Sequence, residues 1–197
     1  MSARIVLASK SAIRRRILID AGLDIDVVSP GVDEDAVKTR LAGQGAEAIA
    51  QTLAEAKARA VSLQRLEDWV IGADQILRFN DRLYDKVASM DAAKTRLQTL
   101  RGQAHDLVGA VALAHAGEIR RVHVSAARLE MRMFSDAFLD SYLERAGEGI
   151  LASVGCYAYE GLGAQLFSRV DGDYFAVLGL PLLPVLSMLR DEGAAPS

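Results

Sequence analysis

The first 30 residues alternate between short apolar runs and one amphipathic segment, a pattern that predicts a strand–helix–strand unit. The apolar runs cover residues 4–8 and 25–29, and the helical segment between them covers about 12–21. Gly22 follows this segment directly and is a typical residue for a helix end. Because a strand–helix–strand opening is characteristic of α/β proteins, we expect an α/β fold.

Three consecutive arginines, Arg14 to Arg16, occupy the first turns of this predicted helix. The N-terminal end of a helix carries partial positive charge, so cations are unfavourable there. The effect reverses where a polyanion binds, because backbone N–H groups, the hydroxyls of Ser9 and Ser11 and the guanidinium groups all donate to phosphate oxygens. The feature indicates a small phosphorylated ligand. An isolated Arg-Arg-Arg run is also typical of an exposed basic helix face, and that alternative stays open at this point.

Length and composition exclude several classes of protein. A chain of 197 residues, 51% hydrophobic and 25% charged, suits one globular domain or two closely joined lobes. The net charge of −3 argues against a general coat for nucleic acid polymers. The single cysteine, Cys156, favours a reducing compartment, and neither a signal-peptide pattern nor a membrane-spanning run is present. We therefore expect a cytoplasmic protein that does not enter a membrane.

The rest of the chain continues the α/β pattern. Ser135 is a suitable N-cap and Pro181 a suitable first residue for two of the predicted helices. The helices are expected near 46–66, 91–101, 136–145 and 182–191, and the strands at 69–71, in a hairpin of 106–114 with 119–132, and near 164–170. The pattern is weakest over 79–89, the best candidate for a seam.

Acidic residues follow two of the predicted strands. The apolar run 69–71 predicts a buried strand that ends at Gly72-Ala73-Asp74, and ligands of open α/β sheets bind at such strand ends. Asp74 is therefore a candidate for chemistry, with a turn-capping aspartate as the alternative. Asp33-Glu34-Asp35 follows the second strand and either caps the next helix or joins Asp74 in holding a divalent cation.

Two lysines complete the set of candidate residues. Lys57 lies in an alanine-rich helix, and Lys86 directly follows Asp85 in a loop. Each lysine alone is typical of an exposed surface, but together with Arg14 they would neutralise a triphosphate. The Gly-Lys-Ser/Thr phosphate loop is absent, and the three histidines lack metal-ligand spacing, so we interpret them as structural.

Taken together, these motifs resemble the Maf family of nucleoside triphosphate pyrophosphatases. The family's opening Leu-Ala-Ser-x-Ser-Pro-x-Arg-Arg corresponds to Leu7–Arg15, with Ala12 in place of proline. Its Ala-x-x-Lys-Ala corresponds to Ala54–Ala58, which selects Lys57, and its Gly-Ala-Asp to Gly72–Asp74. These matches occur in the family's order along the chain.

The remaining matches extend the resemblance over almost the whole chain. The family's Asp-Glu pair is Asp33-Glu34, and its Lys-Pro is Lys86-Val87, a second lost proline. Near the C-terminus the pattern is completed by 155–163, Gly172-Asp173-Tyr174 and Gly179-Leu180-Pro181-Leu182.

The resemblance implies a fold, a reaction and partners. The implied fold is a mixed, twisted α/β sheet in two lobes with the active-site cleft between them, as a single Maf-like domain over 1–197. The implied reaction cleaves the bond between the α and β phosphates, giving a nucleoside monophosphate and diphosphate with the help of Mg²⁺, Mn²⁺ or Co²⁺. Family members are often homodimers, and the family has been linked to arrest of septum formation.

The resemblance also implies roles for individual residues. Asp74 would orient and deprotonate the attacking water, and Glu34 would hold the metal together with Asp74. The residues assigned to the substrate's phosphates are Ser9, Arg14, Arg15, Lys57 and Lys86.

Gln75 and Glu160 look like the branch of the family that acts on 7-methyl-GTP. A carboxylate accepts from the N1–H and exocyclic amine of guanine and favours a cationic methylated base. The lost prolines and Ile13 depart from the family pattern, so preference for dTTP and UTP stays open. Two other functions also stay open. One is a regulator of septum formation that binds nucleotides without hydrolysing them, and the other is a pyrophosphatase for inosine or xanthosine triphosphates. The acids at 34 and 74 argue against pure binding, which needs no water-activating group.

Overall fold

Seven strands in the computed structural model, which describes residues 4–195, pair into one mixed sheet. Their order is β2-β1-β3-β5-β6-β7, with β4 paired to β3. The strands β1 and β3 are parallel, whereas β4 and β7 join antiparallel neighbours. The strands are β1 (Ile5–Ala8), β2 (Ile25–Val27), β3 (Trp69–Phe79), β4 (Arg82–Tyr84), β5 (Ala104–His115), β6 (Glu118–Met131) and β7 (Phe167–Asp171). The predicted α/β class is confirmed.

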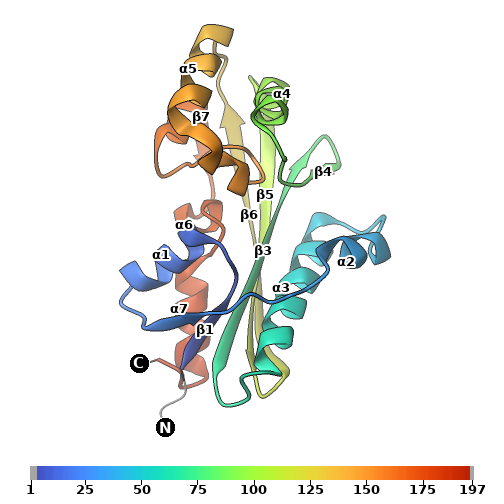
Figure 1. Ribbon diagram of the computed structural model, residues 1–197, viewed down its shortest axis with the longest axis vertical. Helices are drawn as coiled ribbons and strands as arrows, with labels where there is room; N and C mark the ends of the chain where they lie inside the picture. The colour runs from blue at the N-terminus through green and yellow to red at the C-terminus, as the bar shows by residue number, and fades with distance from the viewer. Residues whose placement is uncertain (1–3, 196–197) are drawn as a thin grey trace. The chain divides into compact units, whose positions relative to one another are not determined.

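Helices connect most of these strands (Figure 1). They are α1 (Ala12–Asp20), α2 (Glu34–Arg40), α3 (Ala46–Ser62), α4 (Met90–Leu100), α5 (Asp136–Ala146), α6 (Tyr174–Val177) and α7 (Leu182–Asp191), with 3₁₀ turns η1 (Gly147–Ala152) and η2 (Leu162–Leu166). None of the helices between residues 4 and 195 combines the length and apolar character that a membrane crossing needs.

The chain divides into two compact units. The first comprises the residues up to Gln75, Val108–Ser125 and the residues from Tyr174 onward, and the second comprises Ile76–Leu107 and Ala126–Asp173. The seam expected over 79–89 is wrong, because the first boundary falls at Gln75, inside β3. Apolar residues after position 75 continue that strand, so no loop marks the boundary in the sequence.

One face of the sheet in the first unit packs against α1 and α7 (Figure 1). Alternate residues of β1 and β3 point to this face, as the two-residue period of a strand requires. The core here is made of aliphatic side chains from these elements and β5: Ile5, Leu7, Ile17, Leu18, Ile71, Ala73, Val111, Leu113, Leu180, Leu182, Val185, Met188 and Leu189.

The opposite face of β3 packs unusually closely against α3, at Gly72. A Cβ atom added at Gly72 would contact the Ala54 carbonyl oxygen and lie 2.6 Å from the Ala58 nitrogen and 2.9 Å from its Cβ. The glycine on the strand and the two small alanines on the helix therefore let the two backbones approach. This packing gives a physical reason for the small residues in Ala54–Ala58 and Gly72–Asp74, because larger side chains there would keep α3 and β3 apart.

The expected end of the strand at Gly72-Ala73-Asp74 is wrong, because β3 continues to Phe79. The continuation pairs with β4, with Leu77 opposite Tyr84 and Phe79 opposite Arg82. It is β1 that ends here, since its last pair joins Ala8 to Gly72. Asp74 thus lies two residues beyond the carboxyl end of β1, within an unbroken strand.

Most other predicted elements are confirmed with shifts of a few residues. Gly22 follows α1 with a φ of 82°, and Ser135 caps α5 by accepting from the Phe138 nitrogen at 3.2 Å. Pro181 is the N-cap of α7 rather than its first residue. The strand expected near 164–170 is shorter, because η2 occupies its first part and β7 begins at Phe167.

A buried histidine and two aromatic rings form part of the core of the second unit. His105 is 1% exposed, and its Nε2 lies 2.7 Å from the Tyr157 hydroxyl. Tyr157 in turn meets Phe167 edge-on, at 4.8 Å between ring centroids. Burial lowers the pKa of His105 to about 4, so this side chain is neutral at pH 7. These contacts agree with the structural role predicted for it.

We predict that Gly72→Ala destabilises the protein and separates α3 from β3. Relief of the overlap with Ala54 and Ala58 requires backbone movement, so the free energy of unfolding should fall by about 3 kcal/mol. Urea denaturation measures this change. Gly149→Ala is the matched control, because a Cβ at Gly149 meets nothing within 4 Å. Equal stability of the two variants would contradict the close packing.

Candidate active site

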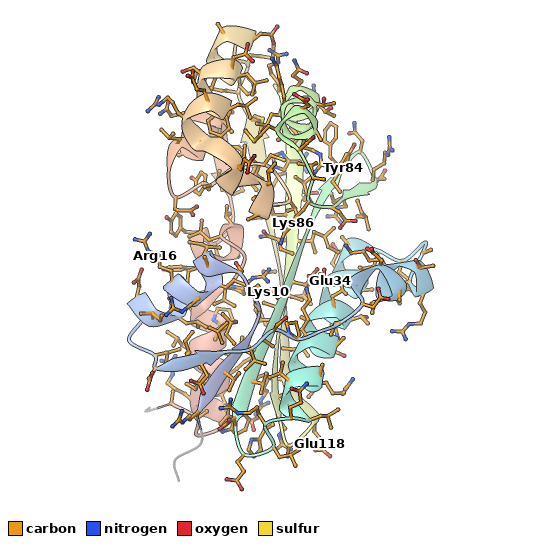
Figure 2. All side chains as sticks on the ribbon, in the orientation of Figure 1. Lys10, Arg16, Glu34, Tyr84, Lys86 and Glu118 are labelled. Atoms are coloured by element: carbon orange, nitrogen blue, oxygen red, sulfur yellow. The ribbon has the colours of Figure 1, made fainter. Side chains whose placement is uncertain are left out.

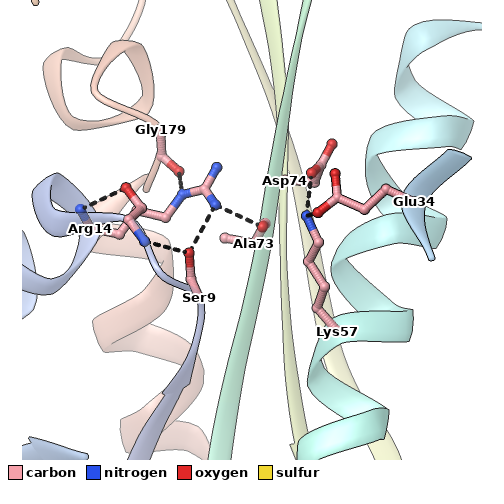
Figure 3. Close-up of polar contacts among 8 residues, drawn as sticks. Ser9, Arg14, Glu34, Lys57, Ala73, Asp74 and Gly179 are labelled. Atoms are coloured by element: carbon pink, nitrogen blue, oxygen red, sulfur yellow. Dashed lines mark hydrogen bonds and ion pairs between the residues drawn. The ribbon is translucent and has the colours of Figure 1, made fainter. Parts of the chain in front are cut away.

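The centre of the candidate site is one ammonium group shared by two carboxylates. Nζ of Lys57 lies 2.7 Å from Oδ1 of Asp74 and 2.7 Å from Oε1 of Glu34 (Figure 3). The side chains of Lys57 and Asp74 are only 8% and 10% exposed, whereas that of Glu34 is 44% exposed. The structure therefore brings together three of the predicted site residues, with Glu34 on the solvent side.

The local sequence explains why each of these three side chains points toward the other two. Asp74 shares a strand face with Gly72, so it points toward α3, where Lys57 lies one turn from Ala54. Glu34 is the first residue of α2, whose N-cap is Asp33, with Oδ1 accepting from the Ala36 nitrogen at 3.0 Å. The acidic cluster thus has both of the roles considered for it: Asp33 caps the helix, and Glu34 faces Lys57.

The electrostatics of Asp74 suit a group that exchanges protons. Burial raises the pKa of the Asp74 carboxyl, and this effect outweighs the opposing influence of Lys57 and, to a smaller extent, of Arg14. Glu34 adds to the increase because it is a like charge. A carboxylate with a raised pKa is a stronger base, which is the property a water-activating group needs.

Arg14 lies on the other side of β3 from Asp74 (Figure 3). Its Nε donates to the Gly179 carbonyl oxygen at 2.8 Å, and its Nη1 donates to the Ala73 carbonyl oxygen at 2.9 Å. Within residues 4–195 no acceptor meets Nη2, which Figure 3 shows pointing away from these contacts. Burial lowers the pKa of this guanidinium, and the charges of Asp74 and Glu34 oppose that effect. Arg14 is thus held by backbone carbonyls and keeps Nη2 for a ligand.

Ser9 is buried beside Arg14. Its Oγ accepts from the Ser11 nitrogen at 3.2 Å and from Nη1 of Arg14 at 3.4 Å, so its own proton remains available to donate. The other two arginines of the helix differ from Arg14. Arg15 is exposed, and Arg16, whose position Figure 2 shows, pairs with Asp20 at 3.3 Å.

Gln75 is anchored through its amide nitrogen. Nε2 donates to the carbonyl oxygens of Ala176 at 2.9 Å and Val177 at 3.3 Å, which ties β3 to α6. In the described chain no donor meets its Oε1, so the oxygen is the atom that remains for a ligand. The contact between Gln75 and the base therefore stays a prediction. In that contact Gln75 would accept a hydrogen bond through Oε1.

The remaining two predicted residues, Lys86 and Glu160, belong to the second unit. Lys86, labelled in Figure 2, lies in the loop that joins β4 to α4, and Glu160 lies in the loop before η2. Both residues are exposed. Their participation with Asp74 in one site stays a prediction.

The backbone acceptors that hold Arg14 are not among the residues predicted from the sequence. A signal for one of them existed, because Gly179 stands in the Gly-Leu-Pro-Leu motif, but the motif alone does not say what its carbonyl binds. The contact joins residues 165 positions apart, so only the fold reveals it.

Comparison with known proteins identifies the family. A family model described as Maf-like protein matches residues 4–192. The chain belongs to the Maf family. The resemblance predicted from the motifs is confirmed.

Individual relatives match along nearly their whole lengths. The nucleoside triphosphate pyrophosphatase of Caulobacter vibrioides is 50% identical over 193 residues, which cover 96% of each chain. That of Maricaulis maris is 46% identical over 190 residues, 96% of this chain and 97% of its own. The 7-methyl-GTP pyrophosphatase of Brucella abortus is 45% identical over 194 residues, 98% of each chain.

Proposed function

We propose that this Maf protein is a nucleoside triphosphate pyrophosphatase, which hydrolyses the bond between the α and β phosphates. The observation that carries the proposal is the buried Asp74 carboxylate, paired with Lys57 and close enough to Arg14 to be influenced by its charge. A nucleotide-binding regulator would need the cations but not a buried acid with a raised pKa. The relatives named for this activity support the same conclusion.

The reaction needs an activated water and a neutralised phosphate chain. Asp74 accepts a proton from water, the water oxygen forms a bond to phosphorus, and the bridging P–O bond breaks. The products are a nucleoside monophosphate and diphosphate. Nη2 of Arg14, the Ser9 hydroxyl and the ammonium of Lys57 donate to phosphate oxygens and stabilise the negative charge that moves to the leaving group. Lys86 and Arg15 are proposed as further phosphate ligands.

The carboxylates of Glu34 and Asp74 fit a divalent cation. Glu34 comes from α2 and Asp74 from β3, yet both carboxylates contact the Lys57 ammonium. They are therefore close enough together to contact a single cation. Two carboxylates, with waters and substrate phosphates, are a typical ligand set for Mg²⁺. When bound, such an ion supplies charge neutralisation at the phosphates. Residues 4–195 contain no cluster of three or more His, Cys, Asp or Glu able to hold a metal. We propose that phosphate oxygens of the substrate complete the ligand set.

The preferred substrate is proposed to be 7-methyl-GTP. Glu160 would accept from the guanine N1–H and exocyclic amine, and Oε1 of Gln75 would be a second acceptor. The Brucella abortus relative named for this nucleotide supports the proposal. A homodimer, a cytoplasmic location and a link to arrest of septum formation stay predictions.

We predict that a hydrolysis screen separates the substrate alternatives. Purified protein is incubated with 7-methyl-GTP, GTP, dTTP, UTP and inosine triphosphate, each with Mg²⁺, Mn²⁺ or Co²⁺. The expected products are the nucleoside monophosphate and inorganic diphosphate, and they should form fastest from 7-methyl-GTP. Preference for dTTP and UTP would contradict the role of Glu160, and release of orthophosphate with a nucleoside diphosphate would contradict the cleavage position.

We predict that Asp74→Asn lowers kcat by about 10²–10⁴-fold, the usual effect of losing a general base. KM should change little, because the cations that bind the phosphates remain. Steady-state kinetics measures both values. Asp24→Asn is the matched control, since Asp24 is an exposed aspartate of the same unit. Wild-type kcat in Asp74→Asn would remove Asp74 from the mechanism.

A further inference from the structure

Arg96, on α4 of the second unit, makes three contacts with a single guanidinium group. Its Nη1 donates to the Asp85 carbonyl oxygen at 3.1 Å and to the Val154 carbonyl oxygen at 2.7 Å. The same guanidinium lies over the ring of Tyr84, with 4.5 Å between Cζ and the ring centroid. The Arg96 side chain therefore connects α4 to two other parts of the chain, at Tyr84–Asp85 and at Val154.

The two carbonyl acceptors, at Asp85 and Val154, lie in irregular segments that carry predicted substrate ligands. Asp85 begins the loop from 85 to 89, and Lys86 is the next residue. Val154 belongs to the segment between η1 and η2, which contains Glu160. Arg96 itself was not singled out from the sequence, because its partners are backbone atoms and a ring.

Contacts hold both ends of the loop from 85 to 89. Its far end is fixed by the α4 N-cap, where Oγ of Ser89 accepts from the Ala92 nitrogen at 3.2 Å. Position 87 is valine, so the backbone at Lys86 lacks the restriction that a following proline would impose. The near end of the loop is held at Asp85 by Arg96.

The chemistry of these contacts requires arginine. A planar guanidinium stacks its face on an aromatic ring while the hydrogens at its edge donate in the plane. One Nη nitrogen carries two hydrogens, which here serve two carbonyl oxygens. A lysine ammonium is compact and not planar, so it cannot reproduce this arrangement.

We infer that Arg96 is a positioning residue, which holds the Tyr84–Lys86 segment so that the Lys86 ammonium is placed for the substrate's phosphates. This inference rests on the proposed function, because Lys86 matters only if a phosphorylated substrate binds. Arg96 does not itself contact substrate. Loss of its side chain should act through Lys86 and therefore mainly on substrate binding.

Arg101, the C-cap of α4, offers a matched control. Its guanidinium lies 5.4 Å from the Phe134 ring centroid, and its Nη1 donates to the Phe134 carbonyl oxygen at 3.0 Å and to Asp136 at 2.8 Å. It thus makes contacts of the same kind, but to a segment without a predicted substrate ligand. Arg101→Met should lose a similar amount of stability and leave kinetics unchanged.

The first test is a double-mutant cycle between Arg96→Met and Lys86→Ala. Arg96→Met alone should raise KM about tenfold and change kcat by less than about twofold, as expected for loss of uniform binding. In the Lys86→Ala background the same substitution should change kcat/KM by less than about twofold, because the two residues act as a unit. The inference would be overturned if Arg96→Met lowered kcat/KM by the same factor in the Lys86→Ala background as in wild type. It would also be overturned if the KM of Arg96→Met equalled that of wild type. Arg96→Lys should behave like Arg96→Met.

The second test does not depend on activity. Trypsin cleaves after lysine, so digestion of the native protein, with fragments identified by mass spectrometry, reports the freedom of the Lys86–Val87 bond. Arg96→Met should speed cleavage there at least about tenfold relative to wild type and to Arg101→Met. Unchanged cleavage would overturn the inference even in an active enzyme. If wild-type protein hydrolyses no nucleoside triphosphate, the proposed function fails, and the cleavage rates still decide whether Arg96 holds the loop.

Discussion

The site depends on the ammonium of Lys57, buried between the carboxylates of Asp74 and Glu34. A buried charge without a partner is very costly, and breaking such a pair typically destabilises a protein by about 3–5 kcal/mol. The pairing therefore fixes how α3 lies against β3, and the small residues at Gly72, Ala54 and Ala58 make that approach sterically possible. Packing and electrostatics thus specify the same contact between helix and strand.

Arg14 illustrates a second consequence of this arrangement. A cation near a helix N-terminus is unfavourable by itself, but here the carbonyl oxygens of Ala73 and Gly179 accept from it. These acceptors orient the guanidinium and leave Nη2 for an anion. The direction of this proposed phosphate-binding group is thus set before a ligand arrives, which reduces the entropy lost on binding.

The sequence predicted most elements because their signals are local: Gly22 ends α1, and the Ser135 hydroxyl caps α5. Motifs at fixed spacing also selected Glu34, Lys57 and Asp74, which the structure brings into contact, and their roles stay predictions. The sequence failed where pairing with distant strands decides the outcome, as in the continuation of β3 past Asp74. It also missed contacts made to backbone atoms, such as those of Arg96, because a carbonyl oxygen has no residue-specific signature.

The most direct test of the role of the Lys57–Asp74 pair is the pH dependence of kcat/KM in wild type and in Lys57→Met. Activity should fall on the acid side as Asp74 gains a proton, because burial raises the pKa of this carboxyl. Lys57 lowers that pKa, so its replacement by methionine should move the acid limb up by about 1–3 pH units. An acid limb that stays in place, or that moves to lower pH, would show that Asp74 is not the base held by Lys57.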